Sequence, residues 1–299
     1  MQIFRIPFEA MASTCEVVLC ADDEGTAQAL AQTAIDEVKR VEHKYSRYRT
    51  DSIVSRINRA AGGEWVECDE ETAALCTYAD SLFQNSSGLF DITSGVLRQA
   101  WDFRRAVVPS EETLAPLLAL IGWHRVERRD RNIRLPDAGM EIDFGGFGKE
   151  YAADRAADAL AGQGLKHGYV NLAGDMRILG PKPDDQPWMI GIQDPRRHGG
   201  LMATIPVASG ALATSGDYER FFEIGERRYC HVFNPRTGQP VTHWRSVSVL
   251  APRAIVAGSC STIAMLKQAE GKAFLEEAGM DYLAVDHQGN FHQRGDDAH

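Results

Sequence analysis

The stretch IDFGGFGKEYAADRAADALAG, residues 142–162, joins an apolar segment to a glycine-rich turn and then to a helical pattern. A strand that ends in glycines before a helix can present backbone N–H groups to an anion. The stretch is not a Walker loop, which needs Gly where Asp143 stands and Ser or Thr where Glu150 stands. It does not fit the dinucleotide fingerprint either. A tight turn that binds nothing is the alternative, but Asp143 and Lys149 flank the glycines and favour a ligand.

Outward from this stretch, strands and helices follow one another without strict alternation, which favours an α+β fold with mixed sheets and flanking helices. Apolar residues at helical spacing predict helices at 26–45, 70–85, 149–161 and, interrupted at Gly271, 259–278. Strand patterns occur at 2–8, 14–21, 132–135, 140–144, 168–172, 175–180, 188–193, 201–208, 219–224, 227–233, 245–251, 281–286 and 290–293. With no repeat and no clear linker, we expect residues 1–299 to form one domain.

Composition limits the classes of function. A chain of 299 residues can bury a sizeable core without disulfides. Its net charge of −10 argues against a general nucleic-acid binder, which needs a basic surface. No apolar run reaches the roughly 18 residues of a membrane span, and the first residues do not resemble a signal peptide. Six scattered cysteines favour reduced thiols over a metal or disulfide set, so we expect a cytoplasmic protein.

Three further motifs carry hydroxyl or imidazole groups, and the first two allow two interpretations each. Thr214 and Ser215 could bind a phosphate or simply make a turn. His231 precedes an Asn-Pro-Arg-Thr-Gly turn and is either a structural histidine or one at the mouth of a site. The run SCST at 259–262 reads as an N-cap cluster that opens a helix. These residues are compatible with a phosphate-bearing, partly aromatic ligand, but by themselves they name no reaction.

Taken together, the motifs resemble the FAD:protein FMN transferase family, also called the ApbE family. The resemblance runs from Met11 to about Gly279, with the family's pieces in the family's order. They are MASTCEVVL, SRYRTDSIVSRIN, GLFDITSGVL, IDFGGFGKEYAADRA, VNLAGDMRILG, WMIGIQDP, ATSGDY, HVFNPRTGQPV and SVSVLAPRAIVAGSCST. The resemblance implies two lobes around a cleft for the flavin nucleotide.

The resemblance also implies a reaction. Such enzymes break the pyrophosphate of FAD, transfer FMN to a Thr hydroxyl of an acceptor protein and release AMP. A divalent cation, usually Mg²⁺, neutralises the diphosphate, as in phosphoryl transfer generally. Some relatives use water instead and hydrolyse FAD to FMN and AMP. The implied partners are therefore FAD and an acceptor protein, with no nucleic acid and no membrane span.

Site residues carry over by position. The resemblance places the following residues around the flavin nucleotide: Met11, Tyr48, Leu89, Phe90, Asp91, Asp143, Lys149 and Phe233. Tyr48 would contact a ring face, and Lys149 would be a cationic donor. His231 would be the general base toward the acceptor hydroxyl. The backbone carbonyl of Gly146 and the side chain of Thr262 would belong to the cation site.

The chain departs from the family at that cation site. The family's late segment reads roughly Ala-Asp-x-x-x-Thr, whereas Gly258 stands here in place of the carboxylate. Since Mg²⁺ favours carboxylate oxygens, we expect a weakened site, which Gly258→Asp would improve. Glu150 replaces a Gly that often follows the family's Lys, and its charge could either compensate or repel the ligand. The alternatives to a transferase are an FAD hydrolase and a non-catalytic flavin-binding or interaction protein.

Overall fold

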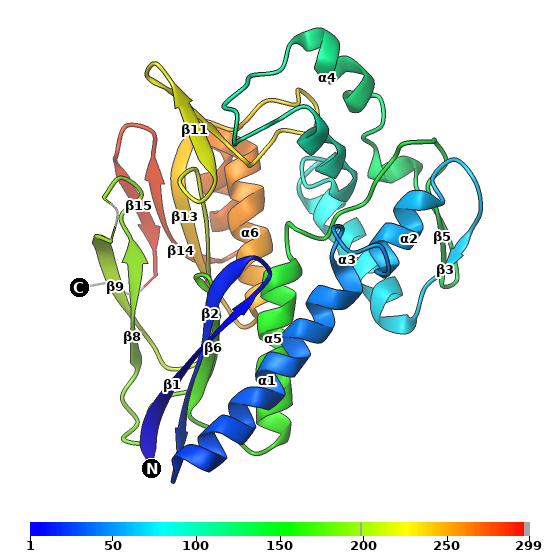
Figure 1. The fold of residues 1–299 in the computed structure, drawn as a ribbon. Helices are drawn as coiled ribbons and strands as arrows, with labels where there is room; N and C mark the ends of the chain where they lie inside the picture. The colour runs from blue at the N-terminus through cyan, green and yellow to red at the C-terminus, as the bar shows by residue number, and fades with distance from the viewer. Residues whose placement is uncertain (198, 296–299) are drawn as a thin grey trace.

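An eight-stranded sheet forms the centre of the computed structural model, which describes residues 1–197 and 199–295 (Figure 1). All of its neighbouring strands pair antiparallel. In spatial order they are β1 (Gln2–Ala10), β2 (Ser13–Ala21), β6 (Gly168–Leu172), β7 (Asp175–Gly180), β10 (Gly210–Gly216), β13 (Trp244–Ala251), β14 (Asp281–Asp286) and β15 (Phe291–Arg294). The expected α+β class is confirmed, but the described strands make antiparallel rather than mixed sheets.

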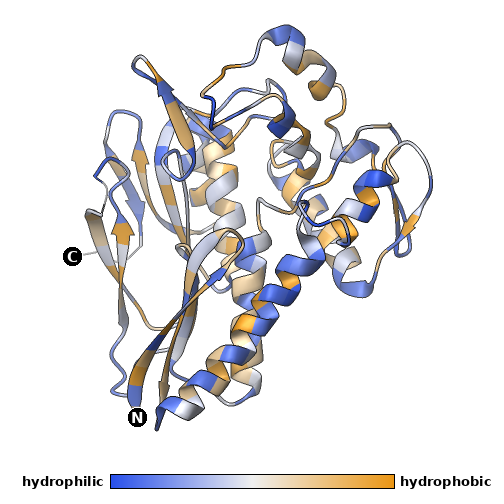
Figure 2. Cartoon of the chain, in the orientation of Figure 1, coloured by the Kyte–Doolittle hydropathy of each residue, from blue (hydrophilic) through white to orange (hydrophobic). Residues whose placement is uncertain are grey.

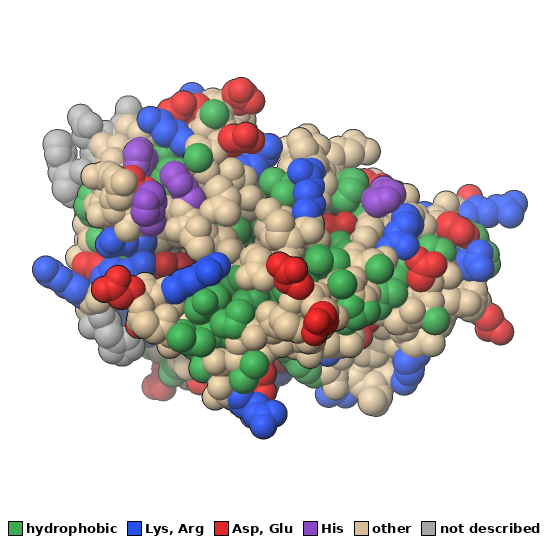
Figure 3. All heavy atoms as spheres, turned by 90° about the horizontal axis from the view of Figure 1, so that it is seen from above, with side chains coloured by type: hydrophobic (Ala, Val, Ile, Leu, Met, Phe, Trp, Pro, Cys, Tyr) green, Lys and Arg blue, Asp and Glu red, His purple; other side chains and the backbone are tan. Residues whose placement is uncertain are grey.

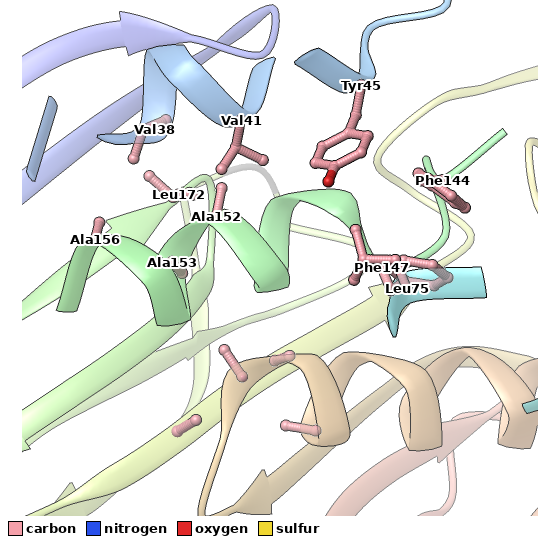
Figure 4. Packing of buried hydrophobic residues seen from close by; sticks show 14 of the residues in the cluster. Val38, Val41, Tyr45, Leu75, Phe144, Phe147, Ala152, Ala153, Ala156 and Leu172 are labelled. Atoms are coloured by element: carbon pink, nitrogen blue, oxygen red, sulfur yellow. The ribbon is translucent and has the colours of Figure 1, made fainter. Parts of the chain in front are cut away.

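Three helices cover one face of this sheet: α1 (Glu24–Tyr45), α5 (Gly148–Gly162) and α6 (Ala254–Lys267). Figure 2 shows hydrophilic and hydrophobic residues alternating along α1, as expected for a helix with one face in solvent. Figure 4 shows Val38 and Val41 of α1 above Ala152 and Ala156 of α5. All four side chains are buried. Alanine on α5 lets the helices approach closely, so α5 lies between α1 and α6 with little room for larger residues.

A hairpin covers part of the other face of the sheet. It consists of β8 (Trp188–Gln193) and β9 (Leu201–Val207). Burial alternates strictly along β8, and its inward residues pack with sheet residues such as Val18 and Ile178 in a second core. The part of the central sheet under this hairpin is therefore buried on both sides.

The remaining elements gather mainly beside the helical layer and form a second lobe (Figure 1). They are α2 (Ile53–Arg59), β3 (Val66–Glu67), α3 (Glu70–Asn85), η1 (Ile92–Gln99), α4 (Glu111–Leu118), η2 (Trp123–Arg125), β4 (Glu127–Arg129) and β5 (Asn132–Arg134). Outside this lobe are the hairpin of β11 (Phe221–Ile224) with β12 (Arg227–Cys230), and η3 (Gln268–Glu270) with α7 (Gly271–Glu277). Most strands were predicted to within two residues.

Two predictions about elements are wrong, and one open alternative is resolved. Residues 140–144 form no strand, and Thr214 and Ser215, which could bind a phosphate or make a turn, lie in the strand β10. The small residues of β10 have weak strand propensity, but a central strand packed under a helix needs small side chains. Residues 259–262 do not cap a helix, because α6 already begins at Ala254. Residues 259–262 lie in the interior of α6, and the hydroxyls of Ser261 and Thr262 contact Ser215 of β10 instead of capping the helix.

In the described residues all six thiols are free, and five of them are buried. No helix in residues 1–197 or 199–295 has the length and hydrophobicity to cross a membrane. Figure 3 shows acidic and basic side chains interspersed on one face of the molecule, without a continuous basic patch there.

Candidate functional site

A cleft of about 350 Å³ lies where the start of α5 meets η1, the ends of β10 and β12, and α6. Most of the residues expected at the site line it. They are Leu89, Phe90, Asp91, Asp143, Gly146, Lys149, His231, Phe233 and Thr262. Segments that are far apart in sequence thus supply one cavity with backbone, cationic, aromatic and hydroxyl groups.

Two expected residues, Met11 and Tyr48, are not among the residues that line this cleft. Met11 occupies the turn between β1 and β2 with a left-handed φ of 52°, and its N–H donates to Glu42 at 2.7 Å. The Tyr48 side chain is 76% exposed, and the Arg47 guanidinium lies 5.0 Å from its ring centre. Arg47 itself lines the cleft, so Tyr48 is next to a lining residue.

The glycine turn opens the N-terminus of α5 toward the cleft. Asp143 Oδ1 accepts a hydrogen bond from the Gly145 N–H at 2.9 Å, and its other oxygen pairs with Arg47. A Cβ on Gly146 would lie 2.8 Å from the Phe90 ring, so only glycine fits there. No side chain caps α5 at Phe147. The positive end of the helix dipole is therefore available to an anion.

Two cations face the cleft without a carboxylate partner. Within the described ranges, no ion pair involves Lys149 or Arg220, and both line the cavity. The Arg220 guanidinium lies 4.9 Å from the centre of the Phe103 ring. Asp91, in contrast, already uses both carboxylate oxygens, accepting from the Thr93 N–H at 2.8 Å and the Trp123 N–H at 2.9 Å. Asp91 therefore shapes the wall, and the free cations are suited to a diphosphate.

Three further carboxyl groups line the cleft. The side chain of Glu150 is buried, and burial, followed by the nearby Asp175, raises the pKa of this carboxyl well above its usual range. Burial also raises the pKa of Asp175 to about 7, although Lys149 acts in the opposite direction. Glu219 contributes a third, more exposed carboxylate. In the absence of a further cation, these neighbouring carboxyls therefore cannot all stay ionised.

A group of hydroxyls connects β10 with α6. Ser215 Oγ lies 2.7 Å from Ser261 Oγ and 2.9 Å from Thr262 Oγ1. The Ser261 hydroxyl also donates to the Gly258 carbonyl at 2.9 Å. Of these residues, Ser215 and Thr262 line the cleft. The late motif therefore contributes hydroxyl oxygens to the site from the middle of a helix.

His231 follows β12 and is open to the cleft, although protein surrounds that part of the cavity. This withdrawal from bulk water, together with the Arg220 and Lys149 cations, lowers the pKa of His231 to about 4. The imidazole is therefore neutral at pH 7 and able to accept a proton. Next to it, the Phe233 ring stacks on Trp101 with centroids 5.3 Å apart and forms an aromatic wall.

The relative position of α5 and α6 is fixed by Asp154. Its carboxylate oxygens accept hydrogen bonds from the Ala254 N–H at 2.9 Å and the Ile255 N–H at 3.0 Å. Asp154 thus caps α6 from a neighbouring helix, since Arg253 at the N-cap provides no side-chain cap. Gly258 lies one turn beyond Ala254, and Glu150 lies one turn before Asp154, so the same register brings them together.

Sequence reasoning did not assign Arg47, Asp175, Glu219 or Arg220 to the site, although all four line the cleft. Arg47 and Asp175 fall inside motifs that carry the family resemblance. A charged side chain inside a motif of the family was therefore the signal by which Arg47 and Asp175 could have been assigned to the site. Glu219 and Arg220 have no comparable signal, since only the fold brings residues just before β11 to the helix α5.

The comparisons with known proteins agree on one family. The sequence profile described as "ApbE family" matches residues 11–284. A curated FAD:protein FMN transferase of Vibrio cholerae is 30% identical over 85% of this chain and 78% of its own length. One of Treponema pallidum is 31% identical over 86% of this chain and 78% of its own length.

Solved structures give the same result. An ApbE protein from Thermotoga maritima matches with a TM-score of 0.90 and 31% identity, covering 98% of this chain and 97% of that one. A flavin transferase ApbE from Vibrio cholerae matches with a TM-score of 0.85 and 25% identity, covering 98% and 96%. With the fold, the motifs and the cleft in agreement, this chain belongs to the ApbE family.

Proposed function

We propose that this chain transfers FMN from FAD to a Thr hydroxyl of an acceptor protein and releases AMP. One observation carries the proposal: an uncapped helix N-terminus, two free cations, a neutral histidine and an aromatic wall line the same cleft. This set suits a dinucleotide with a charged diphosphate between two aromatic groups. The curated relatives carry the name of this activity.

The chain's own residues would perform three tasks. Lys149, Arg220 and the N–H groups at the start of α5 would hold the diphosphate and orient its FMN-side phosphorus. The aromatic wall of Phe233 and Trp101 would exclude water. Leu89 and Phe90 would complete the apolar side of the pocket. Because Asp91 and Asp143 already accept hydrogen bonds, we propose that they fix the lining rather than provide free acceptors.

In the transfer step, the Thr oxygen of the acceptor would attack the FMN-side phosphorus. The bond from that phosphorus to the bridging oxygen would break, and AMP would leave with the bridging oxygen. His231 would accept the proton of the Thr hydroxyl, which requires the neutral imidazole that the lowered pKa provides. The positions of His231 and Lys149 in one cavity agree with this division of tasks.

Oxygen donors at the site fit a hard cation. The described residues contain no group of three His, Cys, Asp or Glu side chains that could hold a metal alone. Carboxylate residues, Thr262 and Gly146 line the cleft instead, and Mg²⁺ commonly combines one or two carboxylates with substrate phosphates. Gly146 and Thr262 would thus hold Mg²⁺ in the presence of FAD. When bound, the cation would neutralise charge on the diphosphate.

The test is a mass measurement. The protein is incubated with FAD, Mg²⁺ and a Thr-containing acceptor peptide. A peptide that gains FMN, with AMP released, supports the proposal. Free FMN without peptide labelling indicates the hydrolase, and bound but unchanged FAD indicates the binding protein. The variant His231→Asn should lower the transfer rate by about 10²- to 10⁴-fold while FAD still binds.

Domain organisation and location belong to the same proposal. We propose that residues 1–299 act as one catalytic domain, since the cleft takes its lining from both lobes. The residues 198 and 296–299 lie outside the described structure. The cytoplasmic location stays a prediction.

A further inference from the structure

Gly258 occupies an unusual position for a glycine. It is buried in the interior of the helix α6, where glycine costs roughly 1 kcal/mol relative to alanine. A packing reason therefore has to offset this cost. A Cβ built on Gly258 would lie 2.1 Å from Glu150 Oε1 and 2.5 Å from Glu150 Cγ. The carboxylate arm of Glu150 thus occupies the space into which a side chain at position 258 would extend.

The Glu150 carboxylate has no partner from another residue in the described structure. The residue is only 7% exposed, and it lines the cleft. Within residues 1–197 and 199–295, no other residue donates a hydrogen bond to it and no ion pair includes it. A buried carboxylate without a partner is costly, and one facing a cavity indicates a ligand that supplies the missing contacts.

The surroundings of Glu150 are rich in oxygen. Asp175 is close enough to raise the pKa of Glu150 by charge repulsion. Thr262 and Ser215, which share a 2.9 Å hydroxyl contact, line the same cleft. The carbonyl of Gly146 belongs to the turn that precedes Glu150. Carboxylate, hydroxyl and carbonyl oxygens are the donor set of a hard divalent cation such as Mg²⁺.

We infer that Glu150 is the carboxylate ligand of the cation site, supplied from α5 across the space left by Gly258 on α6. In the family the carboxylate comes from the position of Gly258 on α6, whereas here it comes from Glu150 on α5 and reaches the same part of the cleft. The cation site therefore keeps a negative ligand, and we expect it to bind Mg²⁺ without the weakening that the sequence suggested. For the same reason Gly258→Asp should not improve the site, since its side chain would overlap Glu150.

This inference rests on the proposed function, so the test measures cation binding apart from turnover. Mn²⁺ is titrated into the whole protein with saturating FAD and no acceptor, and free Mn²⁺ is measured by electron paramagnetic resonance. Glu150→Gln keeps the shape of the side chain and should raise the Kd for Mn²⁺ by about tenfold or more. FAD affinity without metal is measured on the same samples, and it should not fall.

A matched control separates ligation from general charge. Glu219→Gln removes the same charge from the same cleft, at a position that is exposed. It should change the Kd for Mn²⁺ by less than about threefold, because the nearest atoms to a Cβ on Gly258 belong to Glu150 and not to Glu219. An equal loss in the two variants would overturn the inference. So would Mn²⁺ binding by Glu150→Gln that matches the wild type.

A swap provides the second measurement. Gly258→Asp alone should lower the melting temperature, because the introduced Cβ overlaps Glu150. Glu150→Gly alone should lose Mn²⁺ affinity. The double variant, with Glu150→Gly and Gly258→Asp, should regain most of the Mn²⁺ affinity. If it binds Mn²⁺ no better than Glu150→Gly does, Glu150 does not replace a carboxylate at position 258. If the double variant does not fold, Glu150→Gln decides. If FAD does not bind to the wild type with or without Mn²⁺, the proposed function fails instead.

Discussion

At the scale of single residues, the cleft separates polar groups that hold the structure from those left for a ligand. Asp91 has both oxygens bonded by backbone and side-chain donors of the second lobe. Asp143 is similarly used by Gly145 and Arg47. Lys149 and Glu150 are adjacent in sequence and have opposite charges, but neither forms an ion pair in the described structure, and both line the cleft. Residues that look equivalent in a motif thus have different tasks.

Lys149 gives the first prediction. Lys149→Met keeps much of the aliphatic length but removes the charge, and it should raise the Kd for FAD by about 10- to 100-fold, the effect of one charged hydrogen bond. Fluorescence titration without metal measures it. The control Lys166→Met alters an exposed lysine outside the cleft and should leave the Kd unchanged. Equal affinity in wild type and Lys149→Met would remove Lys149 from the site.

At the scale of elements, three helices meet at Glu71 at the start of α3. Its carboxylate accepts hydrogen bonds from Arg40 of α1 at 2.7 Å and from Tyr151 of α5 at 2.6 Å, and it pairs with Lys44. Burial opposes ionisation, but the hydrogen bonds from Arg40, Lys44 and Tyr151 prevail and hold the pKa of Glu71 well below its usual range. This junction connects α3 to the helical layer and so helps position the α5 end of the cleft.

The lowered pKa of Glu71 predicts a pH-dependent stability. Its contribution is complete above the unfolded-state pKa of about 4.3 and is lost as the pH falls below it. Glu71→Gln should therefore lower the free energy of unfolding by about 1–2 kcal/mol at pH 7, and the difference should shrink below about pH 4. Urea unfolding at both pH values measures this. Glu70→Gln, exposed in the same turn, should cost under about 0.5 kcal/mol.

Asp154 gives a prediction about the α5–α6 contact. The Asp154 carboxylate accepts hydrogen bonds from two N-terminal N–H groups of α6 and forms ion pairs with Arg177 and Arg253. Asp154→Asn removes the negative charge and one of the two acceptor oxygens. It should lower the free energy of unfolding by roughly 2–4 kcal/mol, because Arg177 keeps a poorly paired charge. The control Asp158→Asn weakens only a half-exposed pair with Arg253 and should cost less than about 1 kcal/mol. Similar losses in the two variants would contradict the capping role.

At the scale of the whole molecule, the two faces of the central sheet have different tasks. One face carries α5 and α6, which line the cleft. The other carries the β8–β9 hairpin, whose Trp188 packs edge-on against Tyr169 with ring centroids 5.1 Å apart. The Trp188 indole N–H also donates to the Gly180 carbonyl at 2.9 Å. Stability from this face should therefore be separable from ligand binding.

The fourth prediction tests this separation. Trp188→Ala should lower the free energy of unfolding by about 3–5 kcal/mol through the cavity it leaves. The Kd for FAD of the folded variant should stay within about twofold of the wild type, since distant sites act independently. Chemical unfolding and FAD titration measure the two quantities. Met189→Ala, on the exposed side of the same strand, should change the unfolding free energy by less than about 0.5 kcal/mol.

Local patterns in the sequence were sufficient to predict most elements. The apolar spacing of 26–45 and 70–85 gave the helices α1 and α3, and Asp69 caps α3 through the Thr72 N–H at 2.9 Å. The motifs also gave the family, and most of the site residues that they predicted line the cleft. Such features depend on short-range periodicity, caps and turns, which the residues themselves determine.

Only the tertiary structure decided what Gly258 and Glu150 do. In the sequence, position 258 lacks a carboxylate and position 150 has an additional one, with 107 residues between them. Asp154 caps α6 across the helix contact, and this brings the Glu150 carboxylate to the place that Gly258 leaves free. The same contact explains why α6 begins earlier than its hydroxyl run suggested. The packing of α5 against α6 fixes the positions of Glu150 and Gly258, and no local sequence pattern encodes this packing.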